Sequence, residues 1–305
     1  VMLFINRRGF APIVQCKKCG WNAQCPDCSV GMTYHKKIGK LLCHMCGRTA
    51  PVPSSCPDCG GVVSMRGAGL EKIQEEVNIR FPNAKTALVS SDTMMSRQSL
   101  ERLVDKMESG EIDIVIGTQI LAKGHHFPNL TLVGVVDADM GLFGTDFRAA
   151  EHTFQQLFQV AGRAGRGSTP GRVLLQTYQP EHPVMAAICA ADRDTFMEND
   201  MNARAAAKMP PYGQLIAIIV EGQREDVLQK YCRELATTAP ALNGGRIMGQ
   251  IAAGVYQIRN WYRMRFLVAG DERANLQPIV KQGLAKTKVP TKVRVKIEVT
   301  PHNFM

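Results

Sequence analysis

The chain has 305 residues, a formal net charge of +10 and an apolar content of 45%. This length is sufficient for two or three globular domains. The longest apolar run, Leu215 to Val220, is too short to span a bilayer, so we expect no membrane contact. Positive charge is concentrated in residues 206–305, which hold 15 Lys or Arg and seven Asp or Glu residues. A basic block of this kind indicates a surface that faces a polyanion, nucleic acid above all.

The first two thirds of the chain alternate between predicted strands and predicted helices. Met2–Ile5 is a short apolar run typical of a buried strand, and its position after Val1 indicates the middle of a longer protein. This alternation predicts an α/β fold, in which a parallel sheet carries helices on both faces. Further strands are expected over residues 85–89, 113–117, 130–136 and 172–177, and helices over residues 67–80 and 96–107.

Eight of the ten cysteines form four Cys-x2-Cys pairs within 44 residues. A two-residue spacer lets both thiolates of a pair reach one metal ion, and two pairs complete the four-thiolate tetrahedron that structural zinc prefers. The pairs therefore predict two Zn²⁺ sites. No secretory signal is visible, so reduced thiols in a cytoplasmic protein are expected rather than a disulfide framework.

Two ways of grouping the four pairs remain open. In the nested grouping, which we favour, the inner pairs form a zinc ribbon around two strand-like runs at residues 32–35 and 40–42, and the outer pairs share the second metal. This grouping brings the ends of the cysteine-rich segment together, as insertion into another domain requires. In the sequential grouping, the first two pairs share one metal and the last two share the other. The nested sites are Cys16, Cys19, Cys56 and Cys59, and Cys25, Cys28, Cys43 and Cys46.

Residues 113–129 combine a buried strand with a Gly-Thr step and a Gly-x-x-x-Pro-Asn loop. This arrangement resembles motif V of superfamily 2 helicases, in which the loop backbone and a hydroxyl hold a DNA phosphate. The resemblance implies DNA contacts from Thr118 and Lys123. Asp137 and Asp139 end the next strand, at the side of a sheet where ligands usually bind. For these two carboxylates a structural turn role and a functional role both remain open.

Residues 159–166 have the Gln-x-x-Gly-Arg-x-Gly-Arg form of helicase motif VI. Two arginines three residues apart lie on neighbouring positions of one helical turn. Their guanidinium groups suit a triphosphate whose charge shifts in the transition state. We therefore expect Arg163 and Arg166 to be catalytic, and Gln159 and Gly162 to bind nucleotide together with them.

The pattern changes after Met209, and residues 209–305 are expected to form a small basic α+β domain with an open sheet. Two of its predicted strands alternate between basic and apolar residues, which places the basic residues of each strand on one face. Such a face suits the DNA backbone, and the neighbouring Trp261 suits base stacking. A half-buried strand with a solvated outer face is the alternative interpretation. The candidate DNA-binding residues are Arg263, Arg265, Lys292, Arg294 and Lys296.

The motifs thus resemble those of a RecA-like helicase second lobe. The predicted organisation is the first strand of helicase lobe 2 at residues 1–12, a zinc insert at 13–66, the rest of helicase lobe 2 at 67–208 and the basic domain at 209–305. This architecture closely resembles the bacterial PriA replication-restart helicases over essentially the whole chain. The resemblance implies an ATP- and Mg²⁺-dependent 3′→5′ DNA helicase that recognises stalled or abandoned forks and D-loops and promotes primosome assembly. It also implies a nucleoid-associated protein that contacts forked and single-stranded DNA, the acidic tail of single-stranded-DNA-binding protein and, in some bacteria, PriB and DnaT.

The chain has no Gly-x4-Gly-Lys-Ser/Thr loop and no Asp-Glu-x-His box. The phosphate cradle, the magnesium ligand and the water-activating acid would therefore lie in another lobe, and we expect this fragment to be inactive alone. Two other functions compete with the helicase interpretation. One is a non-catalytic zinc-ribbon module that binds DNA or protein on a helicase-like scaffold, and the other is a RecG-like translocase, which gives no reason for eight paired cysteines.

Overall fold

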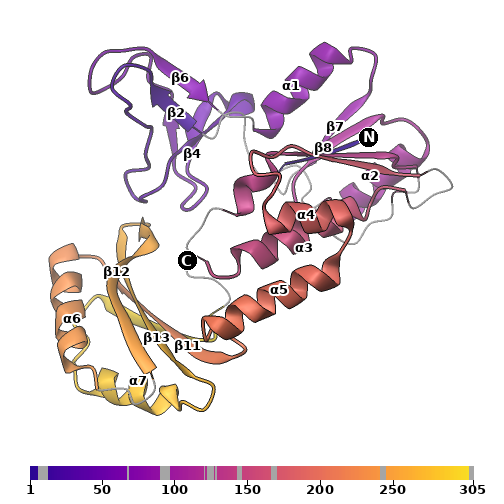
Figure 1. Cartoon of the computed structure of the whole chain (residues 1–305). Coiled ribbons are helices and arrows are strands. Elements are labelled where there is room, and N and C mark those ends of the chain that lie inside the picture. Colours follow the sequence, from indigo (N-terminus) through magenta and orange to yellow (C-terminus); the bar gives the residue numbers. More distant parts are fainter. Residues whose placement is uncertain are drawn as a thin grey trace. The chain divides into compact units, whose positions relative to one another are not determined.

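The computed structural model describes residues 1–5, 13–66, 69–89, 97–119, 121, 127, 129–142, 146–165, 170–240 and 245–301. The chain divides into two compact units (Figure 1). The first comprises Val1–Ala23, Gly31–Gly144 and Ala149–Arg193. The second comprises Gln24–Val30, Thr145–Arg148 and Asp194–Met305. No helix within the described ranges is both long and apolar enough to cross a membrane.

The first unit is built on a five-stranded sheet in which every neighbouring pair is parallel. The strand that comes first in the sequence lies at the centre of this sheet, and Met2, Phe4 and Ile5 in it are almost fully buried. A parallel sheet of short apolar strands is the fold that the sequence predicts. The order across the sheet is β10 (Arg172–Leu175), β9 (Leu132–Val136), β1 (Met2–Ile5), β8 (Ile114–Gly117) and β7 (Thr86–Val89).

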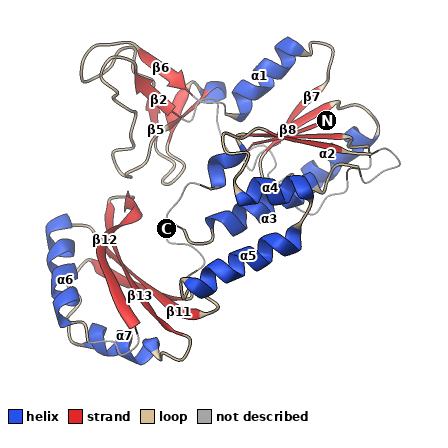
Figure 2. Ribbon diagram, viewed as in Figure 1, coloured by secondary structure: helices blue, strands red, loops and turns tan. Residues whose placement is uncertain are grey.

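Helices cover both faces of this sheet. Helix α1 (Leu70–Arg80) places Leu70 and Val77 against Ile5 and its strand neighbours on one face. Helix α3 (Ala149–Ala161) buries three apolar residues, Phe154, Leu157 and Val160. Figure 2 shows α1 and α3 on opposite sides of the sheet. The first unit also contains α2 (Arg97–Glu108), the 3-10 helix η2 (Ala138–Gly141) and α4 (Pro183–Ala190).

The cysteine-rich segment lies between β1 and α1 and has two small antiparallel sheets of its own. Its first strand, β2 (Ile13–Cys16), pairs with its last strand, β6 (Val63–Arg66), so the segment begins and ends at the same place. The segment is therefore an insertion between the central strand and the first helix of the parallel sheet. The remaining elements are β3 (Thr33–His35), the 3-10 helix η1 (Lys36–Ile38), β4 (Lys40–Leu42) and β5 (Thr49–Pro51).

The second unit contains a four-stranded antiparallel sheet. Two helices, α6 (Glu225–Thr238) and α7 (Leu276–Ala285), pack their apolar residues on one face of this sheet. Helix α5 (Arg193–Ala206) precedes the sheet. The strand order is β12 (Gly245–Ile258), β13 (Trp261–Asp271), β11 (Gly213–Gly222) and β14 (Val293–Val299).

Strand β12 is the main element that sequence reasoning misses. Its residues do not alternate regularly between apolar and polar, and it contains three glycines. Its pairing with β13 shifts register twice, between Met248 and Ile251 and between Ala252 and Gln257. Each shift moves the following side chains relative to the faces of the sheet, so the two-residue period that marks a strand is lost.

Candidate metal centres and nucleic-acid site

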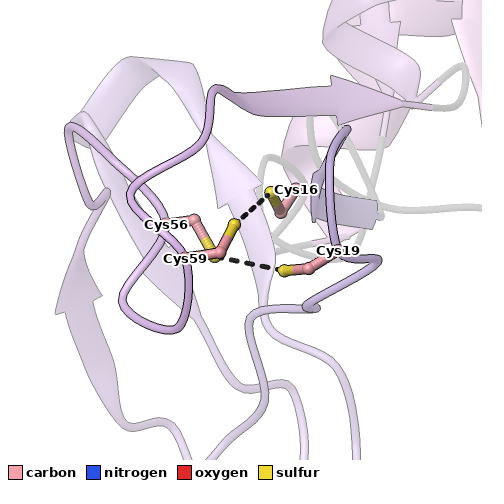
Figure 3. Close-up of side chains that lie close together, drawn as sticks. All are labelled: Cys16, Cys19, Cys56 and Cys59. Carbon is pink, nitrogen blue, oxygen red and sulfur yellow. Dashed lines mark hydrogen bonds between the residues drawn. The ribbon is translucent and has the colours of Figure 1, made fainter.

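The two outer cysteine pairs converge on one point within the inserted segment. Figure 3 shows the four side chains directed toward a common centre. The Sγ atoms of Cys16 and Cys59 lie 3.6 Å apart, as do those of Cys19 and Cys56. Tetrahedral zinc with Zn–S bonds of about 2.3 Å requires S–S separations of roughly 3.8 Å. The cluster therefore has the size of a four-thiolate zinc site.

The two inner pairs form a second cluster of the same kind. In each cluster the ligand atoms all lie within 4.8 Å of one another, and two cysteines of the first cluster and three of the second are buried. The structure thus forms the nested grouping, which is possible because β2 and β6 pair and bring the outer cysteines together. Both clusters are suited to a structural zinc ion with no open coordination position. The second cluster consists of Cys25, Cys28, Cys43 and Cys46.

Three of the four Cys-x2-Cys pairs are followed by a glycine in the left-handed conformation. These are Gly20, Gly47 and Gly60, with φ values of 81°, 83° and 67°. Each donates its N–H to the carbonyl of the first cysteine in its pair. The turn wraps the backbone around the thiolates, and a side chain at this φ would be strained. The fourth pair, Cys25/Cys28, is followed by Ser29.

The thiols of the first cluster influence one another electrostatically. N–H groups of Cys19 and Lys18 lower the pKa of Cys16 to about 6, against the opposing effect of burial. The Gly61 N–H favours the thiolate of Cys59, but the neighbouring thiols, Cys19 first, together with burial raise its pKa to about 12. Four thiolates this close repel each other, and a divalent cation removes that repulsion.

Motif VI begins on the last turn of α3 and continues beyond the end of this helix. The helix ends at Ala161, and Arg163, which is 8% exposed, lies in the turn that follows. The prediction that Arg163 lies on a helical turn is therefore wrong, because the helix ends before Gly162. Arg166 lies outside the described residues. Gln159 and Gly162 lie at the end of the helix and immediately after it.

The motif VI turn packs against the start of β10. Gly165 has a φ of 71°, and its N–H donates to the carbonyl of Leu130. A Cβ atom at Gly165 would come within 2.5 Å of the backbone nitrogen of Gly171. Glycine at this position therefore permits close packing inside the lobe.

Thr118 of motif V lies at the carboxyl end of β8, the edge where parallel sheets bind ligands. Thr118 follows the strand directly, is 7% exposed, and donates its N–H to the carbonyl of Val89. Lys123 lies outside the described residues. Asp139 is buried and accepts hydrogen bonds from Thr177 Oγ1 at 2.5 Å and the Tyr178 N–H at 2.7 Å. These hydrogen bonds support the structural turn role for Asp139 rather than the functional role.

The basic residues of β13 form neither the exposed DNA-binding face that the sequence predicts nor the solvated outer face of the alternative interpretation. Arg263 and Arg265 are 6% and 5% exposed. Arg263 donates from Nε to Glu221 Oε1 at 3.2 Å, and Glu221 is itself buried. Burial lowers the pKa of Arg265. The reason is position: β13 is an internal strand, with β12 on one side and β11 on the other.

The basic residues of β14 are exposed, because β14 is an edge strand. The Arg294 guanidinium stacks on the Trp261 ring at 3.7 Å from its centre, so the predicted stacking residue already has a partner. Lys296 donates to Glu221 Oε1 at 3.0 Å, with about half of its side chain exposed. Lys292, just before the strand, is exposed.

Glu221 is the residue of this region that sequence reasoning misses. It follows the apolar run Leu215–Val220 near the end of β11 and forms ion pairs with both Arg263 and Lys296. A single acid at the end of an apolar run is a weak signal by itself. Its meaning depends on strands 42 and 75 residues further along the chain.

A parallel α/β lobe carrying motifs V and VI and interrupted by two four-cysteine clusters defines the class: a helicase C-terminal lobe with a zinc-ribbon insert. Three family models agree with this class. They are the helicase conserved C-terminal domain over residues 63–168, the PriA DNA helicase Cys-rich region domain over residues 25–51 and the primosomal protein N C-terminal domain over residues 205–302.

The particular family is PriA, and the chain matches its C-terminal part. The chain is 42% identical over 306 residues to replication restart protein PriA of Rickettsia conorii, covering 100% of this chain and 47% of that protein. It is 35% identical over 308 residues to the Haemophilus influenzae protein, covering 100% of the chain and 42% of that protein. The Bacillus subtilis protein is 36% identical over 310 residues, which cover 100% of this chain and 38% of that protein. The chain therefore spans less than half the length of these curated relatives.

Proposed function

We propose that this chain is the C-terminal part of an ATP-dependent DNA helicase that acts in replication restart. One observation supports this most strongly: matches to a PriA-type zinc ribbon, a helicase C-terminal domain and a PriA C-terminal domain follow one another, in this order, in a single chain. The family models cover most of residues 25–302, and the similarity to PriA proteins extends from end to end.

In this proposal the lobe completes a nucleotide site whose other half lies on a first lobe. Arg163 and Arg166 stabilise the charge that develops on the γ-phosphate, and Gln159 and Gly162 place them. ATP and Mg²⁺ are held mainly by the first lobe, which supplies the phosphate loop. Thr118 and Lys123 contact a DNA phosphate. The bound DNA strand and the nucleotide are therefore contacted by neighbouring loops at one edge of the sheet.

The finer aspects of the function follow from the similarity to PriA. We infer 3′→5′ unwinding, recognition of stalled forks and D-loops, and promotion of primosome assembly. The inferred partners are forked and single-stranded DNA in the nucleoid, the acidic tail of single-stranded-DNA-binding protein and, in some bacteria, PriB and DnaT. The exposed cations of β14 are suited to phosphate or to an acidic peptide.

Fork-dependent ATP hydrolysis by the full-length protein is the decisive experiment. We expect hydrolysis to be low without DNA and to rise strongly with a fork that has a single-stranded arm. Strand displacement should then be measured on forks whose arms differ only in polarity. A full-length protein that binds forks but hydrolyses no ATP would instead support the non-catalytic zinc-ribbon module.

A further inference from the structure

The Cys25/Cys28 turn of the second cysteine cluster differs from the other three cysteine turns. In those turns, a glycine follows the second cysteine and closes the turn. Here Ser29 takes that position, and the segment Gln24–Val30 belongs to the same compact unit as β12 and β13. A serine offers a hydroxyl that glycine lacks. The presence of serine instead of glycine therefore adds a hydrogen-bonding group at the one cysteine turn that lies in this unit.

Ser29 makes two hydrogen bonds with Gln257, near the end of β12. Its N–H donates to the Gln257 carbonyl at 2.9 Å, and its Oγ accepts the Gln257 N–H at 2.8 Å. Beside this pair, the Arg259 N–H donates to the Sγ atom of Cys28 at 3.4 Å. A ligand sulfur of the metal cluster thus receives a hydrogen bond from the turn between β12 and β13. Such outer-shell donors orient a thiolate ligand and tune its bond to the metal.

The turn that supplies this donor is conformationally unusual. Its two central residues, Arg259 and Asn260, have φ values of 52° and 63°. Two-residue hairpin turns of this type favour Asn or Gly, and a long side chain such as that of Arg259 is disfavoured there. The contacts from Asp27 compensate, since its carbonyl accepts the Asn260 N–H at 2.9 Å and its Oδ1 accepts Asn260 Nδ2 at 3.3 Å.

We propose that the β12–β13 turn supports the second metal site by supplying an outer-shell hydrogen bond to one of its cysteine ligands. The turn orients Cys28 through the Arg259 N–H, and the metal-ordered Cys25–Ser29 segment holds the turn in its left-handed conformation. A thiolate bound to metal is a stronger acceptor than a thiol, so the hydrogen bonds strengthen when the ion binds. The coupling is reciprocal: any loss of metal loosens the hairpin, and any loss of these hydrogen bonds weakens metal retention to the same degree.

The first test removes the metal without altering the residues that contact the turn. Cys43→Ser should lose one of two zinc ions, and deuterium exchange at amides 257–262 should accelerate about tenfold, the effect of losing roughly one or two net hydrogen bonds. Cys56→Ser is the matched control, since it should also lose one zinc but leave these amides unchanged. Equal exchange in the two variants, or faster exchange throughout β11 and α6 as well, would overturn the proposal.

The second test runs in the opposite direction. Asp27→Ala with Ser29→Gly removes two side-chain partners and gives the turn the Cys-Gly ending of the other three. In a Cys56→Ser background, which keeps only the second zinc, this change should speed zinc transfer to a chromophoric chelator several-fold. The chain provides a control in Asp58→Ala, made in a Cys43→Ser background, because Cys56-Pro57-Asp58-Cys59 repeats the sequence of Cys25-Pro26-Asp27-Cys28. Unchanged zinc transfer in the double variant would show that the turn has no part in the metal site.

Discussion

The parallel sheet of the first unit and the antiparallel sheet of the second place charged residues in different ways. Strands β1, β8 and β9 contain no charged residue, and Thr118 of motif V and Arg163 of motif VI come after β8 and α3 end. In the antiparallel sheet, by contrast, charged residues lie within β11, β13 and β14. A sheet covered by helices on both faces tolerates charge only at its ends. In the antiparallel sheet, α6 and α7 pack on one face. The side chains of Glu221, Arg263 and Lys296 lie on the other face, where Glu221 pairs with both cations.

A second contrast lies within the antiparallel sheet. Strands β13 and β14 have similar basic alternation, but Arg263 is buried and ion-paired while Arg294 is exposed. The difference follows from the positions of the strands, internal for β13 and at the edge for β14. Arg263 in the internal strand therefore serves the fold, whereas Arg294 on the edge strand remains exposed.

The largest expected effect tests whether the end of the parallel sheet is catalytic. In the full-length protein, Arg163→Ala or Arg166→Ala should reduce DNA-stimulated ATP hydrolysis on the order of 10³–10⁵-fold, as loss of an arginine finger does. Arg294→Ala, in the antiparallel sheet, should change turnover at saturating DNA by less than about twofold, since it is placed in DNA binding alone. DNA affinity without nucleotide should hardly change in the motif VI variants. Normal hydrolysis in both of them would make these arginines structural.

The next effect tests the buried charge pair of the antiparallel sheet. Glu221→Ala leaves Arg263 buried without its carboxylate, and we expect the free energy of unfolding to fall by about 3 kcal/mol. This is the low end for a buried pair, because Lys296 is half exposed and can reach water. Asp226→Ala, which breaks the exposed pair with Arg224, should lower the free energy of unfolding far less. Urea titrations followed by circular dichroism distinguish the two, and similar losses would mean that burial does not matter here.

The exposed cations of β14 provide a third test. Lys292→Glu with Arg294→Glu should weaken binding to single-stranded and forked DNA at least about tenfold, and wild-type affinity should fall steeply between about 50 and 200 mM salt. Lys296 is left intact in this variant, since a glutamate there would face Glu221 and destabilise the sheet.

Lys230→Glu with Lys281→Glu is the charge-matched control for the β14 variant. These lysines are exposed on α6 and α7, the helices of the other face. Reversing them changes the net charge by the same amount, so a general effect of charge would weaken DNA binding equally in both variants. An affinity that hardly responds to salt would assign the β14 surface to protein docking instead.

How far the sequence predicts this molecule depends on how local each signal is. Cysteine spacing and strand–helix alternation are local, and they predict the metal clusters and the parallel sheet. The burial of Arg263 is not local, because it depends on Glu221, 42 residues earlier in the chain. Strand β12 is missed because its register shifts erase the alternation. The contact between Cys28 and Arg259 joins residues 231 positions apart, and no pattern near either residue indicates it.

The smallest expected effect concerns the two cysteines outside the clusters, one in each unit. Cys189 in α4 is exposed, whereas Cys232 in α6 is fully buried against the antiparallel sheet. Burial raises the pKa of Cys232 from 9.0 to about 12. The fold therefore favours the neutral thiol, and this contribution to stability is complete below pH 9 and is lost as the pH rises towards 12. We expect the stability difference between wild type and Cys232→Ala to be constant up to about pH 9 and to shrink above it.

Denaturant titrations of the two proteins at matched pH measure that difference, and alkylation should label Cys189 but not Cys232 in the folded protein. A difference that stays constant to pH 11, or rapid labelling of Cys232, would mean that α6 opens far more readily than its packing indicates.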